Sequence, residues 1–313
     1  MSRLSQEPAV AADLVPRHPG SLRLLRRDSD VGLERLLERV DQRIAEVLAE
    51  ATELWLESDG SVPPILGELD LPALLHQLLA SGGKRIRPIM AALGWAACGG
   101  RPGGGSEDRL ASIGAALELL HAFALIHDDV MDEADQRRGR PTAHVLAAAL
   151  HQVAGGRGSP ARFGESIAIL LGDLALAEAD QLIGDLPRPV RRRWRQLTVE
   201  LVCGQRGDLA GSAMPPPDLD QAARVARLKS GRYTVRRPLE LGAAVAGADP
   251  ALLDRLSRYG DELGTAFALR DDVLGVWGDP AVTGKPAGDD LLSGKPTMIM
   301  ALAVRRLDGP DRA

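Results

Sequence analysis

The chain has 313 residues, which allows one large domain or two ordinary ones with a sizeable core. Hydrophobic residues make up 45% of it but aromatic residues only 3%, so the core must consist mainly of Leu, Ala, Val and Ile. The formal net charge of −5 argues against a general nucleic-acid-binding protein. Cys98 and Cys203 belong to no metal-binding pattern, so we interpret them as buried thiols of a protein in the reducing cytoplasm.

The N-terminal part combines an irregular segment with the first helices. Residues 1–28 show no sustained hydrophobic period, so we expect a mobile arm without a signal peptide. No later segment reaches the roughly 18 apolar residues that a membrane span requires. From 31 to 57, apolar side chains recur at helical spacing, and "LPALLHQLLASGG" (71–83) predicts a short helix that ends at two glycines.

The remaining chain predicts further helices and no strand. Pro88 stands in the first turn of one helix, and a long apolar helix follows from about 109 to 132. More helices are expected near 142–152, 162–185, 187–212, 218–229, 235–246, 250–276 and 289–306. Because no internal linker or repeat is visible, residues 29–313 are predicted to form a single all-α domain of long helices rich in Ala and Leu.

The stretch "HDDVMDEADQRRGRP" (127–141) places five carboxylates and then three arginines after an apolar helix. At 100° per residue, Asp128 and Asp132 lie on one helix face, about 6 Å apart along the axis, and His121 lies near the same face. A solvated helix end is the plainer explanation, but carboxylates there oppose the helix macrodipole. Two facing carboxylates instead suit Mg²⁺, which takes oxygen ligands and keeps several waters.

Basic residues follow this motif and recur upstream of it. Surface solubility would explain Arg137 and Arg138, but arginine pairs also bind phosphate in bidentate fashion, and we favour phosphate binding beside a candidate metal site. Upstream, "SGGKRIRP" contributes Lys84 and Arg87. None of these clusters fits the GxxxxGK[ST] pattern after a strand, so a nucleotide-binding fold is not expected.

A second acidic pair, Asp271 and Asp272, ends another apolar run, "LGTAFAL". Downstream, Lys285 and Lys295 each follow a glycine in a GKP turn. Glycine lets the backbone approach a ligand, and lysine adds a mobile charge. Two acidic helix ends and three basic clusters indicate a substrate with several phosphates and metal ions between them, and the apolar residues before the acids indicate that the rest of it is hydrocarbon.

The motifs "GGKRIRP", "DDVMDEADQRRGRP", "GQRGD", "KSG" and "DDVLGVWGDPAVTGKPAGDDLLSGKPT" occur in the order seen in trans-isoprenyl diphosphate synthases, the polyprenyl synthase family, which the chain resembles over about residues 35–306. The resemblance implies an isoprenoid-synthase-type bundle of long antiparallel helices around a central cavity, usually in a homodimer. It also implies Mg²⁺-dependent condensation of isopentenyl diphosphate with dimethylallyl, geranyl or farnesyl diphosphate.

The resemblance assigns metal binding to the two acidic motifs. Asp128, Asp132 and Asp271 resemble direct ligands of three Mg²⁺ ions bound with the substrate diphosphate, and together with Lys229 they form the expected catalytic set. Asp129 and Asp272 are expected to support the same ions.

The two diphosphates are assigned by the resemblance to separate sets of basic residues. Those expected to hold the allylic diphosphate are Arg137, Lys229, Lys285 and Lys295. Those expected to form the isopentenyl diphosphate pocket are Lys84, Arg87, His121 and Arg138. Gln205 and Asp208 are expected one helix away, behind the metal waters.

Product length is assigned to positions just before the first acids. Phe123 and Ala124 lie five and four residues before Asp128, where helical geometry places side chains below the metal site. Simple core packing would also explain Phe123. By resemblance, a bulky residue followed by a small one indicates a C20 product, geranylgeranyl diphosphate, ahead of farnesyl diphosphate.

Three features depart from the family pattern. Ala268 stands where Gln is common, and the large Arg270 precedes the second acidic pair, so phosphate contacts there are expected to differ. The sequence ends at Ala313, and we expect the domain to lack the C-terminal helices of the family.

Two other functions compete with the synthase. A class I terpene cyclase would share the fold, but 3% aromatic residues leave few rings to stabilise a cation. A non-catalytic partner subunit usually loses acids from one motif, whereas this chain keeps both pairs.

Overall fold

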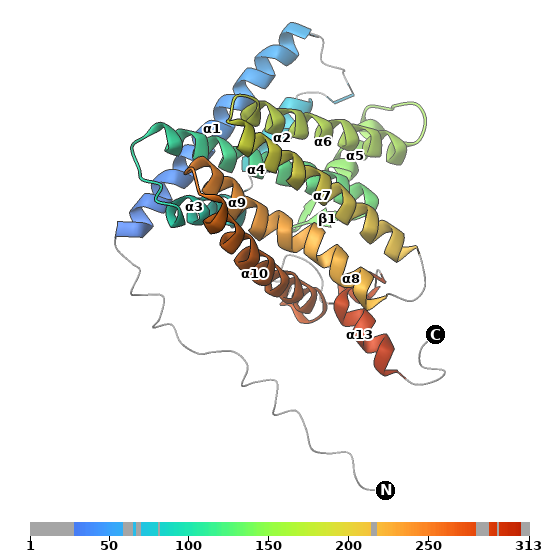
Figure 1. Cartoon of the computed structure of the whole chain (residues 1–313). Coiled ribbons are helices and arrows are strands. Elements are labelled where there is room, and N and C mark those ends of the chain that lie inside the picture. The colour runs from blue at the N-terminus through green and yellow to red at the C-terminus, as the bar shows by residue number, and fades with distance from the viewer. Residues whose placement is uncertain are drawn as a thin grey trace, which may run out of the picture.

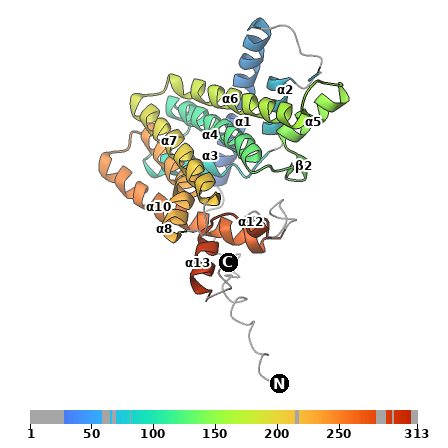
Figure 2. The same ribbon diagram turned by 90° about the vertical axis from the view of Figure 1, so that its right-hand side faces the viewer.

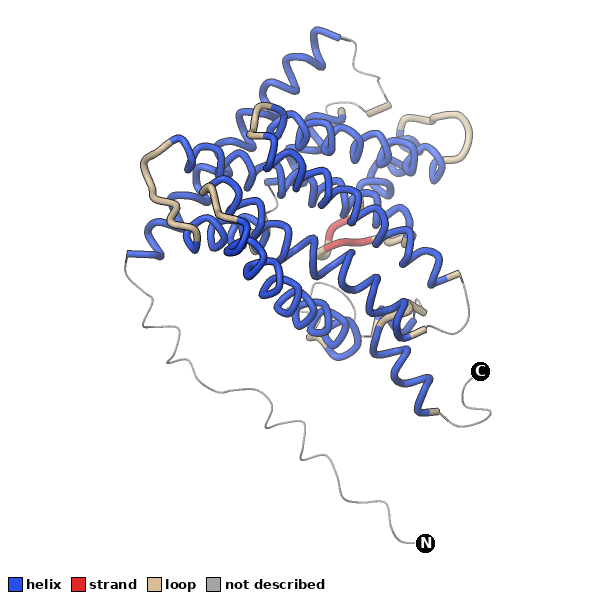
Figure 3. The backbone as a smooth tube through the Cα atoms, viewed as in Figure 1, coloured by secondary structure: helices blue, strands red, loops and turns tan. Residues whose placement is uncertain are grey.

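The computed structural model describes residues 28–58, 65–66, 70–80, 82–213, 218–279, 288–292 and 294–307. Nearly all of the arm expected at 1–28, and also Lys285, lie outside the described residues. The described chain is almost wholly helical, which confirms the all-α fold class (Figures 1 and 3).

A two-stranded hairpin corrects the expectation that the chain holds no strand. Strands β1 (Gln136–Arg137) and β2 (Arg140–Pro141) pair antiparallel and are drawn in red in Figure 3. Arg138 and Gly139 join them with φ angles of 54° and 72°. Positive φ at both central residues is the geometry of a type I′ turn, whose twist suits antiparallel strands. The charged "RRGR" has no apolar alternation from which these strands could be predicted.

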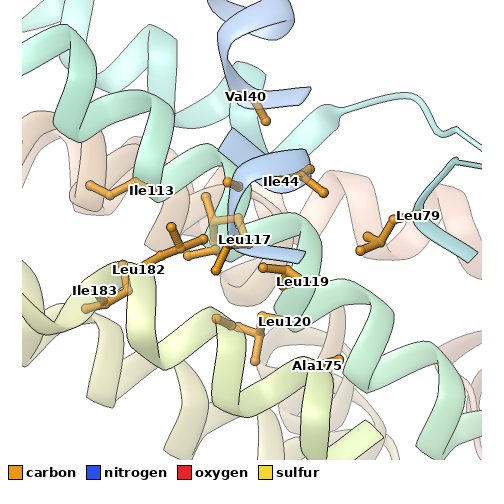
Figure 4. Packing of buried hydrophobic residues seen from close by; sticks show 14 of the residues in the cluster. Val40, Ile44, Leu79, Ile113, Leu117, Leu119, Leu120, Ala175, Leu182 and Ile183 are labelled. Atoms are coloured by element: carbon orange, nitrogen blue, oxygen red, sulfur yellow. The ribbon is translucent and has the colours of Figure 1, made fainter. Parts of the chain in front are cut away.

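Helix α4 forms the centre of the N-terminal half. The helices of this half are α1 (Asp28–Ser58), α2 (Leu71–Ala80), α3 (Ile86–Ala97), α4 (Gly105–Met131), α5 (Ala143–Val153) and α6 (Pro160–Gly184). Figure 4 shows the fully buried α4 residues Leu117, Leu119 and Leu120 among side chains of α1, α2 and α6. Since α4 is buried by its neighbours for most of its length, the position of its last turn is fixed by the core.

The apolar character of α4 also bears on the membrane prediction. Among the described helices, α4 alone is long and apolar enough to cross a membrane, with a mean hydropathy of 1.6 over its best 18-residue window. The expectation that no segment has the length and apolar composition of a membrane span is therefore wrong. However, 67% of that window is buried inside the protein, which is the burial of a core helix.

The C-terminal half carries α7 (Arg188–Ser212), α8 (Leu219–Val225), the π-helix η2 (Ala226–Arg236), α9 (Arg237–Val245), α10 (Pro250–Trp277), α12 (Asp289–Leu292) and α13 (Met298–Arg306). Helices α8, η2 and α9 are continuous, whereas the sequence predicts two helices with a break between them. The helix predicted at 289–306 is interrupted before α13, because Gly294 has a φ of 63° and Pro296 cannot continue a helix. Figure 2 shows α12 and α13 together at one end of the molecule.

The cysteines differ from the expectation of two buried thiols. Cys203 is exposed on α7, and Cys98 is half-buried at the end of α3. Both are free thiols.

Helices η2 and α10 approach each other backbone to backbone. A Cβ atom added at Gly231 would stand 2.8 Å from the carbonyl oxygen of Gly264, and one added at Gly264 would stand 2.7 Å from that of Gly231. Two glycines are therefore required where these helices cross.

The Gly231→Ala substitution is expected to lower the free energy of unfolding by about 1–3 kcal/mol, since the new methyl group overpacks this crossing. Urea denaturation measures the change. Gly184→Ala is the matched control, because a Cβ there meets nothing within 4 Å, and it should leave stability unchanged or raise it by up to about 1 kcal/mol. A Gly231→Ala variant as stable as the wild type would contradict the close crossing.

Candidate active site

Three helices meet at the carboxylate of Asp128, in the last turn of α4. Lys229 Nζ, on η2, donates to Asp128 Oδ1 at 2.9 Å and to Asp208 Oδ2, on α7, at 2.6 Å. Gln205 Nε2, also on α7, donates to Asp128 Oδ1 at 2.8 Å. Helix α7 can come this close because Gly204 has no Cβ atom. A Cβ atom at this position would lie only 2.7 Å from the backbone nitrogen of Lys229. The structure thus brings together four residues that the sequence assigned to one site.

The second carboxylate of the first motif binds a lysine from the C-terminal part. Lys295 Nζ lies 2.6 Å from Asp132 Oδ2. The side chains of Lys295 and Asp132 are 18% and 22% exposed, so the pair is mostly removed from water but still reached by it. The second GKP turn is therefore placed directly beside the first acidic motif.

Asp129 faces away from this pair into the core and binds Arg137. The Arg137 Nε and Nη2 atoms donate to the two Asp129 oxygens at 2.6–3.0 Å, and Nη2 lies 4.0 Å from Asp128. Asp129 is 5% exposed, so its charge requires such a partner. The bidentate pair ties the β1–β2 hairpin to the end of α4.

The charges of this cluster reinforce one another. Burial alone would raise the pKa of Asp128, but the Lys229 ammonium and the hydrogen bonds to the carboxylate outweigh it and hold the pKa below its usual value. Burial likewise opposes the charge of Lys229, yet Asp128 and Asp208 raise its pKa well above the ordinary value. Both groups are therefore ionised at neutral pH.

The second acidic pair lies on α10. Asp271 is exposed and has no partner among the described residues. Asp272 Oδ2 accepts the backbone N–H of Met298 at 3.2 Å, at the start of α13. This bond holds α13 against α10, next to the segment that carries Lys295.

The partly exposed carboxylates of the first motif form an open site for a metal ion. No group of three His, Cys, Asp or Glu side chains close enough to hold a metal lies within the described part of the chain, so a closed protein cage is not formed there. Asp128 and Asp132 instead offer carboxylate oxygens on side chains that are 17% and 22% exposed. Such a site fits Mg²⁺, which is commonly held by one or two carboxylates, waters and substrate phosphates.

The residues assigned to the isopentenyl diphosphate pocket fall into two neighbouring groups. Arg87 donates to Thr234 Oγ1 at 3.1 Å and stacks on Tyr233, whose hydroxyl lies 3.1 Å from His121 Nδ1. On the surface, Arg138 Nη1 donates to the Gly82 carbonyl oxygen at 2.5 Å. This bond joins the hairpin to the loop that carries the exposed Lys84.

Tyr233 and Thr234 were missed by sequence reasoning. Tyr233 lies four residues after Lys229, a spacing that places the two on neighbouring parts of a helix surface. A lone tyrosine in a predicted break between helices gave no other signal.

The positions assigned to product length lie under the first motif. Phe123 and Ala124 are half-buried and pack against the hydrophobic core. The Phe123 ring lies 4.7 Å from the His127 ring, centroid to centroid, and His127 in turn fits against Gly172 of α6. Helix α6 thus forms a second wall beside Phe123.

One cavity lies elsewhere. It has a volume of about 280 Å³ and lies between α6 and α7, lined by Asp180, Ile183, Gly184, Arg191, Trp194, Arg195 and Thr198. This cavity shares no residue with the acidic motifs. The candidate active site is therefore recognised by its ion pairs and not by this cavity.

The site thus consists of an aspartate motif at the end of the central helix of an all-α fold, with each of two aspartates paired to a lysine. The chain belongs to the polyprenyl synthetase family, whose model matches residues 70–313. It is 38% identical to the geranylgeranyl diphosphate synthase of Mycobacterium tuberculosis over 229 residues, 72% of this chain and 59% of that protein. It is 34% identical to the geranylfarnesyl diphosphate synthase of Aeropyrum pernix, over 75% of this chain and 70% of that protein.

A solved structure shares the fold. It is the geranylgeranyl pyrophosphate synthase of Corynebacterium glutamicum, complexed with isoprenyl diphosphate and magnesium. The TM-score is 0.80 at 39% identity, covering 89% of this chain and 79% of that one. The chain spans 59% of the length of the mycobacterial relative.

The Asp128→Asn substitution is expected to lower the free energy of unfolding by about 1–2 kcal/mol at pH 7, because a charged hydrogen-bond acceptor is lost. The folded-state pKa of Asp128 is depressed, so its contribution is complete above the unfolded value of 3.8 and is lost as pH falls through the folded value. The stability difference between wild type and variant should therefore be constant from pH 7 to about 5 and shrink below that. Denaturant titrations without divalent ions measure it, and a difference that grows on acidification would contradict the pairing.

Proposed function

We propose that residues 29–313 act as one domain that condenses isopentenyl diphosphate with dimethylallyl, geranyl or farnesyl diphosphate, as a Mg²⁺-dependent trans-prenyltransferase. The observation that carries the proposal is the pairing of Asp128 with Lys229 and of Asp132 with Lys295 at the end of the apolar helix α4. Carboxylates that can bind metal ions therefore lie next to ammonium groups that can bind phosphate, within one site. Membership of the polyprenyl synthetase family supports the same chemistry.

Mg²⁺ bound at Asp128 and Asp132, in a proposed set of three ions, would supply the positive charge that stabilises a departing diphosphate. Each lysine has three N–H donors, of which carboxylates engage two on Lys229 and one on Lys295. The remaining donors have no acceptor among the described residues and can bind diphosphate oxygens. Fixed donors aimed at developing negative charge lower the barrier to breaking the allylic C–O bond.

The condensation needs no nucleophilic side chain. The electron pair of the allylic C–O bond leaves with the diphosphate, and the double bond of isopentenyl diphosphate attacks the allylic carbon. A proton is then lost from the new chain to the departing diphosphate. The apolar residues before Asp128 exclude water, so that water does not capture the allylic cation first.

The assay that tests this function contains purified protein, Mg²⁺, isopentenyl diphosphate and each allylic primer in turn, with products sized after dephosphorylation. A new all-E prenyl diphosphate supports the synthase. Cyclised hydrocarbon from an allylic diphosphate alone would indicate a terpene cyclase. No product without a second protein would indicate a non-catalytic partner subunit.

Asp128→Ala and Asp271→Ala are each expected to reduce turnover by about a hundredfold or more, because each removes a carboxylate proposed to hold a metal ion, worth roughly 3 kcal/mol or more in the transition state. Asp254→Ala is the control, since Asp254 is 67% exposed and pairs with Arg258 on the same helix. Circular dichroism checks that the fold survives. Normal turnover by either variant at saturating Mg²⁺ would contradict the assignment of metal binding to both acidic motifs.

We also propose a cytoplasmic homodimer. The two cysteines are free thiols, which suits the reducing cytoplasm. Apolar side chains are exposed on neighbouring helices α6 and α7: Ile169 (41%), Leu170 (52%), Val199 (54%) and Val202 (59%). A second copy of the chain would cover them.

Val199→Asp combined with Val202→Asp is expected to convert the dimer to a monomer, because charges buried in an apolar interface are costly. Light scattering gives the mass. Leu93→Asp, at a 52% exposed position on α3, is the control that should remain dimeric. A double variant that keeps the dimer mass would place the interface elsewhere.

We propose geranylgeranyl diphosphate as the main product and farnesyl diphosphate as the alternative. Phe123→Ala should lengthen the products by one or more C5 units, since hydrocarbon fills the opened space at roughly 0.8 kcal/mol per CH₂ group. Ala124→Phe should shorten them. Chromatography of the dephosphorylated alcohols measures both, and if neither variant shifts the distribution, another helix such as α6 sets the limit.

A further inference from the structure

One buried tyrosine connects three helices within the proposed isopentenyl diphosphate pocket. Tyr233, on η2, is 4% exposed, and its hydroxyl lies 3.1 Å from Nδ1 of His121 on α4. The guanidinium carbon of Arg87, on α3, lies 4.1 Å from the centroid of the Tyr233 ring. Arg87 Nη2 also donates to the neighbouring Thr234 at 3.1 Å. Tyr233 thus touches two of the residues assigned to this pocket.

The direction of the hydrogen bond between Tyr233 and His121 follows from burial. Burial raises the pKa of Tyr233 to about 12, so the hydroxyl keeps its proton at neutral pH. Burial and the neighbouring arginines keep the pKa of His121 well below 6.5, so its ring is neutral. No other described residue accepts from the Tyr233 hydroxyl, and a buried donor without an acceptor is costly. The hydroxyl therefore donates to Nδ1, and the ring proton of His121 resides on Nε2.

Two donors remain beside this tyrosine. His121 Nε2 makes no hydrogen bond to a described residue. Arg87 Nε is buried and also lacks a partner among them. Since a buried polar group without a partner is rare in proteins, Arg87 Nε points to an acceptor beyond the described residues, and an anion lying there would also accept from His121 Nε2.

We propose that Tyr233 is a positioning residue for isopentenyl diphosphate: its hydroxyl fixes His121 as the Nε2–H tautomer and its ring fixes the plane of Arg87, so that both present N–H donors to the diphosphate. The inference rests on the proposed function, which supplies the identity of the anion. A merely space-filling tyrosine would need the ring but not the hydroxyl.

Tyr233→Phe tests the hydroxyl because it keeps the ring and nearly the same volume. The KM for isopentenyl diphosphate should rise about tenfold, the effect of one lost hydrogen bond in a pocket, while the KM for the allylic diphosphate and kcat stay within about twofold. Tyr259→Phe is a matched control, since Tyr259 is the other tyrosine of the chain and is 59% exposed on α10. It should leave all three constants unchanged. A Tyr233→Phe enzyme with an unchanged KM for isopentenyl diphosphate would overturn the proposal.

Nitrogen-15 NMR of the histidine rings gives a readout that does not depend on turnover. The His121 signals, identified by their loss in His121→Gln, should show the Nε2–H tautomer in the wild type and a mixture of tautomers in Tyr233→Phe. An Nδ1–H ring in the wild type would overturn the proposal even if the variant fails to fold. A wild type that makes no prenyl product would instead refute the proposed function, and the tautomer comparison would still decide the role of Tyr233.

Discussion

The ammonium group of Lys229 between the carboxylates of Asp128 and Asp208 is the interaction on which the rest of the site depends. The three side chains are 22%, 17% and 15% exposed, so none of them is freely hydrated. Two carboxylates this close would repel each other, and one would take up a proton, without a cation between them. Removing Lys229 would leave two largely buried carboxylates without the cation that they share. Charge therefore fixes how α4, α7 and η2 stand relative to one another, in addition to apolar packing.

The backbone is shaped to allow this contact. Gly204 lets α7 approach the backbone of Lys229, and Gly231 lets η2 approach Gly264 of α10 from another direction. The segment η2 is a π-helix of 11 residues, which is an unusual length for this wider type of helix. π-Helical segments are frequently found at functional sites. An ion-pair network supports this segment on its remaining sides, where arginines of η2 and α9 meet acids of α7, α9 and α10: Arg232, Arg236, Arg237, Glu200, Glu240 and Asp261.

The sequence predicts the helices and the first acidic motif well, because both are local patterns. Helical periodicity places the long helix that ends near Asp132 to within a few residues. The spacing of Asp128 and Asp132 identifies the carboxylates that bind lysines in the structure. The π-helix was not predicted, since its geometry depends on contacts with α7 and α10 that hydrophobic periodicity does not record.

Contacts between distant residues were the hardest to foresee. Tyr233 gains its importance from His121 and Arg87, which are 112 and 146 residues away in sequence. The hairpin depends on two positive φ angles within a charged segment rather than on alternating apolar residues. Asp272 contacts the first backbone N–H of α13, a bond that the amino-acid pattern around it does not suggest.

The bond between Lys295 and Asp132 has a consequence for the order in which the protein is made. The two residues are 163 positions apart, and Lys295 belongs to the last described segment. At about 5–20 residues per second, the ribosome adds Lys295 roughly 8–33 s after Asp132. Helix α4 and its apolar neighbours are synthesised well before that time. The nascent chain therefore builds its core first, and Asp132 meets its basic partner only after 163 further residues have been added.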